Sequence, residues 1–98
     1  MDVTALMRES GVGAAVQRLE AGADRILEEA VRICQIPSPT FDEGERAAYV
    51  RARYEALHLT DVTIDAAGNV RGRRPGGGTG PSVAVITHTD TVFPRGTD

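Results

Sequence analysis

The feature that most constrains the fold is a continuous apolar run late in the sequence. Val83, Ala84, Val85 and Ile86 follow one another without a polar residue. Successive side chains of a strand point to opposite faces, so the run predicts a strand at about 82–87 that is covered on both faces. Such a strand is typical of the interior of an α/β sheet, and it needs neighbours at both edges that the chain offers few elements to supply.

Two helices and a weakly patterned start are predicted ahead of this strand. Residues 1–13 allow one or two helical turns, whereas residues 14–35 carry apolar side chains at three- and four-residue steps along one helix face. Pro37 and Pro39 end that helix, since proline has no N–H to donate. Cys34 lies on the apolar side, which predicts a buried and unreactive thiol.

The second helix is predicted over about residues 41–58. Thr40 and Glu43 have the spacing of a capping box, in which the Thr40 hydroxyl accepts from the Glu43 amide and the Glu43 carboxylate accepts from the Thr40 amide. Near the other end, His58 suits the negative end of the helix dipole, and this interpretation is preferred to a metal-ligand role.

A β-hairpin is predicted next. Residues 61–65 and 69–74 have strand-like sequences and flank a turn in which Gly68 tolerates positive φ. Residues 75–81 are glycine-rich, but the sequence contains no Lys, which a phosphate-binding loop requires, so a flexible linker is preferred. The arginines of the second strand fit a solvated strand face better than a phosphate site.

Charge and cysteine content bear on location and partners. The net charge is −3, from 11 basic and 14 acidic residues, without the clustered basic residues that nucleic-acid binding requires. The start of the sequence lacks the basic and apolar regions of a signal peptide, and no segment is apolar enough to span a membrane. With one cysteine, which cannot form an internal disulfide, these features predict a cytoplasmic protein with no nucleic-acid or membrane partner.

The candidate functional site follows the apolar run. His88 and Asp90 are two residues apart, so in extended backbone their side chains point to the same side. One imidazole nitrogen can then bind a metal ion while the carboxylate accepts from the other nitrogen and fixes the ring. The pair lies beyond the carboxyl end of the predicted strand, where ligand sites of α/β sheets collect. A surface pair or a capping aspartate is the alternative interpretation.

Three segments resemble the M20 family of zinc metallopeptidases and amidohydrolases, which includes carboxypeptidases, aminoacylases, desuccinylases and deacetylases. Residues 85–94, Val-Ile-Thr-His-Thr-Asp-Thr-Val-Phe-Pro, resemble the family's first metal-binding motif. The resemblance covers about residues 27–98. The other two segments agree in order and spacing: residues 36–40 followed by Glu43 and Glu45, similar to the family's N-terminal helix break, and residues 65–70 followed by 73–76, similar to its first hairpin.

This resemblance implies a fold and a metal site. Residues 1–98 would be the N-terminal portion of a single zinc-exopeptidase-type three-layer α/β catalytic domain, incomplete in this chain. His88 matches the first zinc ligand of a two-zinc site, and Asp90 matches the carboxylate that supports its imidazole. The family's bridging Asp, Glu-Glu pair, further acidic ligand and late His have no counterpart, and Asp98 does not match the bridging position.

The resemblance also implies an activity. In a complete family member, zinc-bound water hydrolyses a peptide or N-acyl amide bond while a glutamate transfers the proton. The substrate would be a small peptide or an N-acyl amino acid, and the full-length protein would be able to form a homodimer. Because His88 alone is a poor zinc site, this fragment is expected to be inactive by itself. The alternative is a non-catalytic remnant or small binding module on the same scaffold, while the ordered matches disfavour an unrelated α/β protein.

Overall fold

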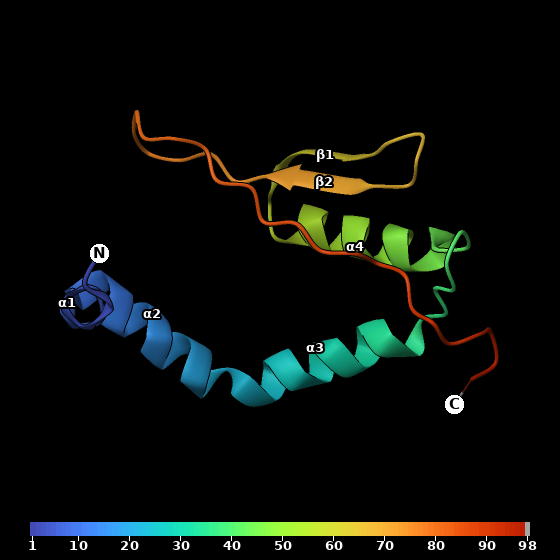
Figure 1. Ribbon diagram of the computed structural model, residues 1–98, viewed down its shortest axis with the longest axis horizontal. Coiled ribbons are helices and arrows are strands. Elements are labelled where there is room, and N and C mark those ends of the chain that lie inside the picture. The colour runs from blue at the N-terminus through green and yellow to red at the C-terminus, as the bar shows by residue number, and fades with distance from the viewer. Residues whose placement is uncertain (98) are drawn as a thin grey trace. The chain divides into compact units, whose positions relative to one another are not determined.

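The computed structural model describes residues 1–97, which combine helices with a small antiparallel sheet (Figure 1). They group into two compact units, Met1–Arg32 and the part from Ile33 onward. At the coarsest level this is the mixed α/β class that the sequence predicts. Within residues 1–97, no helix combines the length and apolar character needed to cross a membrane. The elements are α1 (Val3–Arg8), α2 (Ser10–Ala21), α3 (Ala23–Gln35), α4 (Gly44–Ala56), β1 (Thr60–Ile64) and β2 (Val70–Arg73).

The first unit is helical from near its start. The carboxylate of Asp2 caps α1 by accepting from the amides of Thr4 and Ala5, at 2.9 and 3.3 Å. The single helix predicted over residues 14–35 is instead two helices, with Gly22 between α2 and α3. The weak pattern of residues 1–13 understates the helix there, because α2 begins at Ser10 and its first turns include two glycines.

The apolar face of α3 remains accessible. Ile26, Leu27 and Val31 are 50, 64 and 49% exposed. Cys34, predicted to be buried on the same face, is also exposed. The periodicity correctly predicts an amphipathic helix, but burial requires a covering layer, and the residues described do not bury this face.

The helix predicted over residues 41–58 is shorter, and it ends in a Schellman motif. The amide of His58 donates to the Glu55 carbonyl at 2.9 Å, and that of Leu59 donates to the Tyr54 carbonyl at 3.1 Å. His58 has a φ of 58°, the left-handed conformation that this motif requires. It therefore lies just beyond α4 rather than in its last turn, and its backbone, not its charge, ends the helix.

The predicted hairpin forms with slightly different bounds. β1 and β2 pair antiparallel, with Ile64 opposite Val70 and Thr63 opposite Arg71. At the turn, Asp65 Oδ1 accepts from the amides of Ala67 and Asn69, both at 2.9 Å, while Gly68 takes a φ of 90°. The Asn69 side chain also donates to Asp65 Oδ2, and this bond is the main cause that lowers the pKa of the Asp65 carboxyl.

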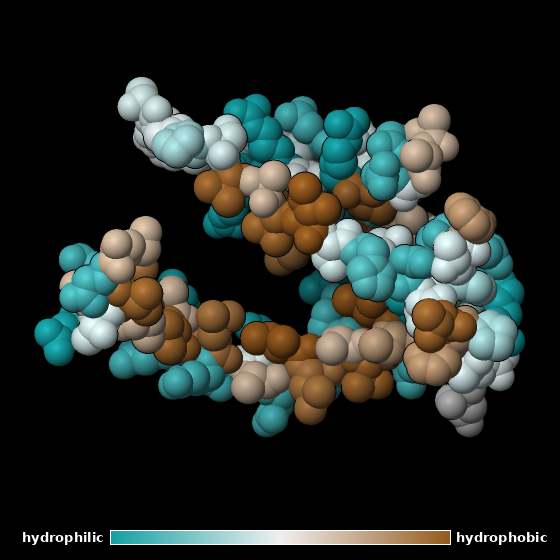
Figure 2. Space-filling view, viewed as in Figure 1, coloured by the Kyte–Doolittle hydropathy of each residue, from teal (hydrophilic) through white to brown (hydrophobic). Residues whose placement is uncertain are grey.

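Close packing joins this hairpin to α4. A Cβ at Gly72 would lie 2.8 Å from Cδ2 of Tyr54 and 3.0 Å from Cδ1 of Leu59, so only glycine fits there without a shift of its neighbours. Among the hydrophobic residues described, Ala47 of α4 is the one that is buried, at 3% exposure. Hydrophobic surface is accordingly prominent on the face shown in Figure 2.

The strand predicted at 82–87 is not formed in this structure. Residues 82–87 are outside any hydrogen-bonded ladder, and Val83, Val85 and Ile86 are 85, 95 and 88% exposed. In the described part of the chain, β1 and β2 pair only with each other, so the apolar run is hydrogen-bonded to no strand. A strand is stable only when its backbone groups have partners, and local sequence alone does not provide them.

Candidate functional site

The segment that carries His88 is fixed to the connection between α3 and α4. The Thr91 amide donates to the Ser38 carbonyl at 2.8 Å, and the Ser38 hydroxyl donates to the Thr89 carbonyl at 2.8 Å. Pro39 and Thr91 form an isolated parallel bridge at the same place. Ser38 is fully buried, so its hydroxyl needs a protein partner, and Thr89 provides it.

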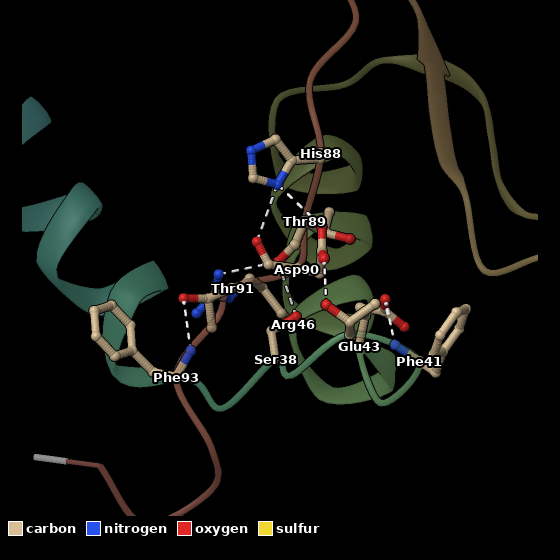
Figure 3. A network of polar contacts seen from close by, with 10 residues as sticks. Ser38, Phe41, Glu43, Arg46, His88, Thr89, Asp90, Thr91 and Phe93 are labelled. Carbon is tan, nitrogen blue, oxygen red and sulfur yellow. Dashed lines mark hydrogen bonds and ion pairs between the residues drawn. The ribbon is translucent and has the colours of Figure 1, made fainter.

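Arg46 of α4 strengthens this attachment. Its Nη1 donates to the Thr89 carbonyl at 3.0 Å, and its Nη2 and Nε donate to the Ile36 carbonyl at 2.7 and 3.2 Å. The residue is only 9% exposed. One guanidinium therefore joins the helix, the segment before it and the segment ahead of Asp90, as Figure 3 shows for the labelled residues.

The predicted contact between His88 and Asp90 is present (Figure 3). His88 Nδ1 lies 3.0 Å from Asp90 Oδ1 and 3.0 Å from the Asp90 carbonyl oxygen. Both partners are acceptors, so Nδ1 must carry the proton. In the neutral ring the lone pair is then on Nε2, and the His88 side chain is 82% exposed, so this nitrogen faces an accessible surface.

Thr40 completes the environment of Asp90. Its hydroxyl donates to Asp90 Oδ2 at 2.6 Å, and this bond, followed by the bond from His88, lowers the pKa of the Asp90 carboxyl below its ordinary value.

The capping box predicted for Thr40 and Glu43 is therefore wrong in its partners. The Glu43 carboxylate accepts from the Phe41 amide at 2.9 Å, and α4 begins after Glu43 without a side-chain cap.

An ion cluster lies close by in the chain. Arg95 binds Asp42 through Nε and Nη2 and reaches Glu45 Oε1 through Nη1 at 3.2 Å. The Arg95 guanidinium lowers the pKa of the Asp42 carboxyl, and both carboxylates raise the pKa of Arg95. The acidic residues before and within the first turn of α4 suggest a helix dipole effect, but no local pattern indicates an arginine some 50 residues away.

Among the residues of this site, His88 is the one that can offer a donor atom to a metal ion. Nε2 is the available donor atom, while the two oxygens of Asp90 are occupied by His88 and Thr40. Among residues 1–97, no group of three or more His, Cys, Asp or Glu side chains is arranged to hold a metal. Asp98 lies outside the described residues. Asp90 therefore fits the supporting position that the sequence analysis gives it better than a ligand position.

No protein-family model matches the chain. A search of curated proteins likewise gives no match. The feature of this chain that bears on function is the polar network around His88, which joins residues 36–40, α4 and residues 88–91.

Proposed function

We propose that His88 is a zinc ligand and that this chain carries the first metal-binding motif of an M20-type metallopeptidase or amidohydrolase. One observation carries the proposal: Nδ1 of His88 lies 3.0 Å from an oxygen of the Asp90 carboxylate, an arrangement in which the ring donates from Nδ1 and leaves Nε2 as the donor atom for a metal ion. A carboxylate on the second nitrogen is the usual support of a metal-ligating histidine, because it fixes the tautomer and makes the ligating nitrogen more basic.

Zinc held in a complete site of this kind would acidify a bound water and polarise the carbonyl of a peptide or N-acyl amide bond. The residues of this chain would contribute the position of one ligand. Asp90 orients the ring of His88, while Ser38 and Arg46 hold the intervening Thr89 carbonyl. In this proposal the chain supplies part of a two-zinc site, and by itself it does not hydrolyse amides.

The proposed fold is part of a zinc-exopeptidase-type three-layer domain. Its support is the run from Val83 to Ile86, whose large side chains are almost fully exposed in this structure although a run of this kind is ordinarily covered on both faces. Small peptides or N-acyl amino acids would be the substrates, and homodimers would form in the full-length protein. A cytoplasmic location belongs to the same proposal, supported by the single cysteine, Cys34, which has no partner for an internal disulfide.

A zinc titration of the ¹⁵N-histidine-labelled chain tests the role of His88. The chain has one other histidine, His58, which is exposed and serves as an internal reference. We expect zinc to shift Nε2 of His88 at lower concentration than either nitrogen of His58. Asp90→Asn should weaken zinc binding about 10- to 100-fold, the range typical for loss of a supporting carboxylate.

The control for this titration is His88→Gln, which keeps a polar side chain but removes the imidazole. It should leave only the weak response of His58. Equal zinc responses of His58 and His88 in the unmodified chain, or a response unchanged by Asp90→Asn, would contradict the proposal.

A further inference from the structure

We propose that Thr40 is a positioning residue that sets the orientation of the His88 imidazole through Asp90. The inference rests on the proposed zinc function. The Thr40 hydroxyl donates to Asp90 Oδ2 at 2.6 Å, and the other oxygen of the same carboxylate, Oδ1, lies 3.0 Å from Nδ1 of His88. The three side chains thus form one continuous series of hydrogen bonds that ends at the proposed ligand.

The exposure of the ring makes this control necessary. The His88 side chain is 82% exposed, so packing does little to select its rotamer. Nδ1 lies 3.0 Å from each of two oxygens, and both belong to Asp90. A carboxylate held through one oxygen can still rotate about its Cβ–Cγ bond. Bonds to both oxygens fix its plane, and a short hydroxyl-to-carboxylate bond is among the stronger hydrogen bonds in proteins.

The backbone around Thr40 places the Thr40 hydroxyl next to the Asp90 carboxylate. Pro39 pairs with Thr91 in a parallel bridge, and Ser38 binds the backbone of Thr89 and Thr91. Because these bonds flank Asp90, the carboxylate and the hydroxyl face each other in a fixed register. The contact therefore follows from the way the two segments are joined, not from the chance meeting of two surface side chains.

The hydroxyl of Thr40 can be removed without removing a helix cap. Glu43 occupies the cap position of α4 and makes no side-chain cap bond, while the Phe41 amide is satisfied by the Glu43 carboxylate. The Thr40 hydroxyl donates to Asp90 Oδ2 instead. A substitution there should therefore act on the carboxylate more than on the helix, which makes positioning separable from stability.

The test compares Thr40→Val, which is nearly isosteric but has no hydroxyl, with Thr40→Ser, which keeps one. The readout is the tautomer of His88 in the metal-free chain, obtained from ring ¹⁵N shifts at about pH 8.5, where an ordinary imidazole is neutral. Thr40→Val should lower the fraction of ring protonated at Nδ1, and Thr40→Ser should retain it. In parallel, Thr40→Val should weaken zinc binding about tenfold, with Thr40→Ser close to the unmodified chain.

The outcomes separate the two proposals. If the tautomer shifts in Thr40→Val and is rescued in Thr40→Ser, positioning stands, even where zinc binds none of the chains and the zinc function itself fails. An unchanged tautomer in Thr40→Val, or the same shift in Thr40→Ser, overturns the positioning role. Should Thr40→Val disturb the amide spectrum of α4, Thr40→Ala removes the same hydroxyl with a smaller side chain and carries the same expectations.

Discussion

Individual side chains join parts of the second unit that are far apart in sequence. The Thr40 hydroxyl meets Asp90 across 50 residues, the Ser38 hydroxyl meets Thr89 across 51, and Arg46 meets Thr89 across 43. Each bond gives a side-chain donor a partner within the chain, where it would otherwise bind water or a backbone group at a helix end. Side-chain hydrogen bonds of this kind are what bring His88 and Asp90 next to α4.

The left-handed backbone of His58 leads to a stability prediction. An L-residue at a positive φ of 58° is strained, and glycine adopts this conformation freely. We expect His58→Gly to raise the free energy of unfolding by about 1 kcal/mol. His58→Ala removes the same imidazole but retains the strain, so it should give no such gain. Urea denaturation of the two variants measures the difference, and equal stabilities would contradict this account of the helix end.

The residues of the site differ in how far sequence alone predicts them. His88 and Asp90 are two positions apart, so extended backbone predicts that their side chains point to the same side, and the two side chains are in contact although the strand predicted before them is not formed. Thr40 follows no such rule. A threonine three residues before a glutamate favours a capping box, but here a carboxylate 50 residues later takes its hydroxyl. Local rules fail where a distant partner competes for the same donor.

Among the elements, α4 has the greatest influence on the site because its first turn carries Arg46. The guanidinium binds the carbonyls of Ile36 and Thr89, so the helix holds the segments on either side of the Thr40–Asp90 contact. Amphipathic spacing predicts that a helix forms here, but it gives no sign that one of its arginines is buried. Arginines are rarely buried unless paired, and the pairing partners here are backbone carbonyls outside the helix.

Arg46→Met tests this role of the helix. Methionine retains much of the apolar stem but leaves the Ile36 carbonyl without its donors and the Thr89 carbonyl with the Ser38 hydroxyl alone, so we expect a loss of about 2 kcal/mol in the free energy of unfolding. Arg51→Met is the matched control on the same helix, where Arg51 forms an exposed ion pair with Glu55 at 3.1 Å. The control should change stability by at most about 0.5 kcal/mol. Similar losses in both variants, measured by urea denaturation, would contradict the role of Arg46.

The hairpin turn supplies a prediction about pH. Hydrogen bonds from Asn69 and Ala67 lower the pKa of the Asp65 carboxyl in the folded chain. A lowered folded pKa means that the carboxylate stabilises the turn fully above its unfolded pKa, about 3.9, and that this stability is lost as the pH falls through the lower folded value. The protection of the hairpin amides, measured as their exchange rates relative to the intrinsic rates at the same pH, should therefore fall on acidification below about pH 4. Asp65→Asn should show no such step, and a step of equal size in the variant would contradict the assignment.

The two strand predictions differ in outcome for a physical reason. The hairpin forms because its strands are neighbours in sequence and its turn residues, Asp65 and Gly68, suit the bend. The run of residues 82–87 has the residue types of a buried strand, but it pairs with neither β1 nor β2 and remains outside the sheet. Apolar composition specifies the need for burial and leaves the partner unspecified.

At the scale of the whole molecule, much hydrophobic side-chain surface is open to solvent. Val83, Val85 and Ile86 in the second unit and Leu19, Ile26 and Leu27 in the first are all at least half exposed. Polar bonds of the second unit, rather than a large apolar core, therefore place the candidate site. The Asp90 carboxylate holds the ring of the proposed ligand, His88. Hydrogen bonds from Ser38 and Arg46 to the Thr89 carbonyl hold the backbone next to it.

This organisation predicts that the purified chain does not hydrolyse amides. His88 provides one donor atom, whereas catalytic zinc sites take about three protein ligands together with a bound water. Assays of dipeptides and N-acyl amino acids with added zinc should show no turnover above that of the His88→Gln variant. Turnover that depends on zinc and is lost in the variant would contradict the partial-site account and would show that further ligands come together in solution.

The protonation of the His88 ring provides the most direct test of the central claim, that Asp90 holds Nδ1–H and presents Nε2 to a metal ion. A two-bond ¹H–¹⁵N correlation spectrum of the unmodified, metal-free chain at about pH 8.5, where a normal imidazole is neutral, reports the tautomer of each histidine. We expect the His88 ring to be mainly protonated at Nδ1, which lies 3.0 Å from two oxygens of Asp90, in contrast to the ring of His58. A His88 ring protonated mainly at Nε2 would contradict it.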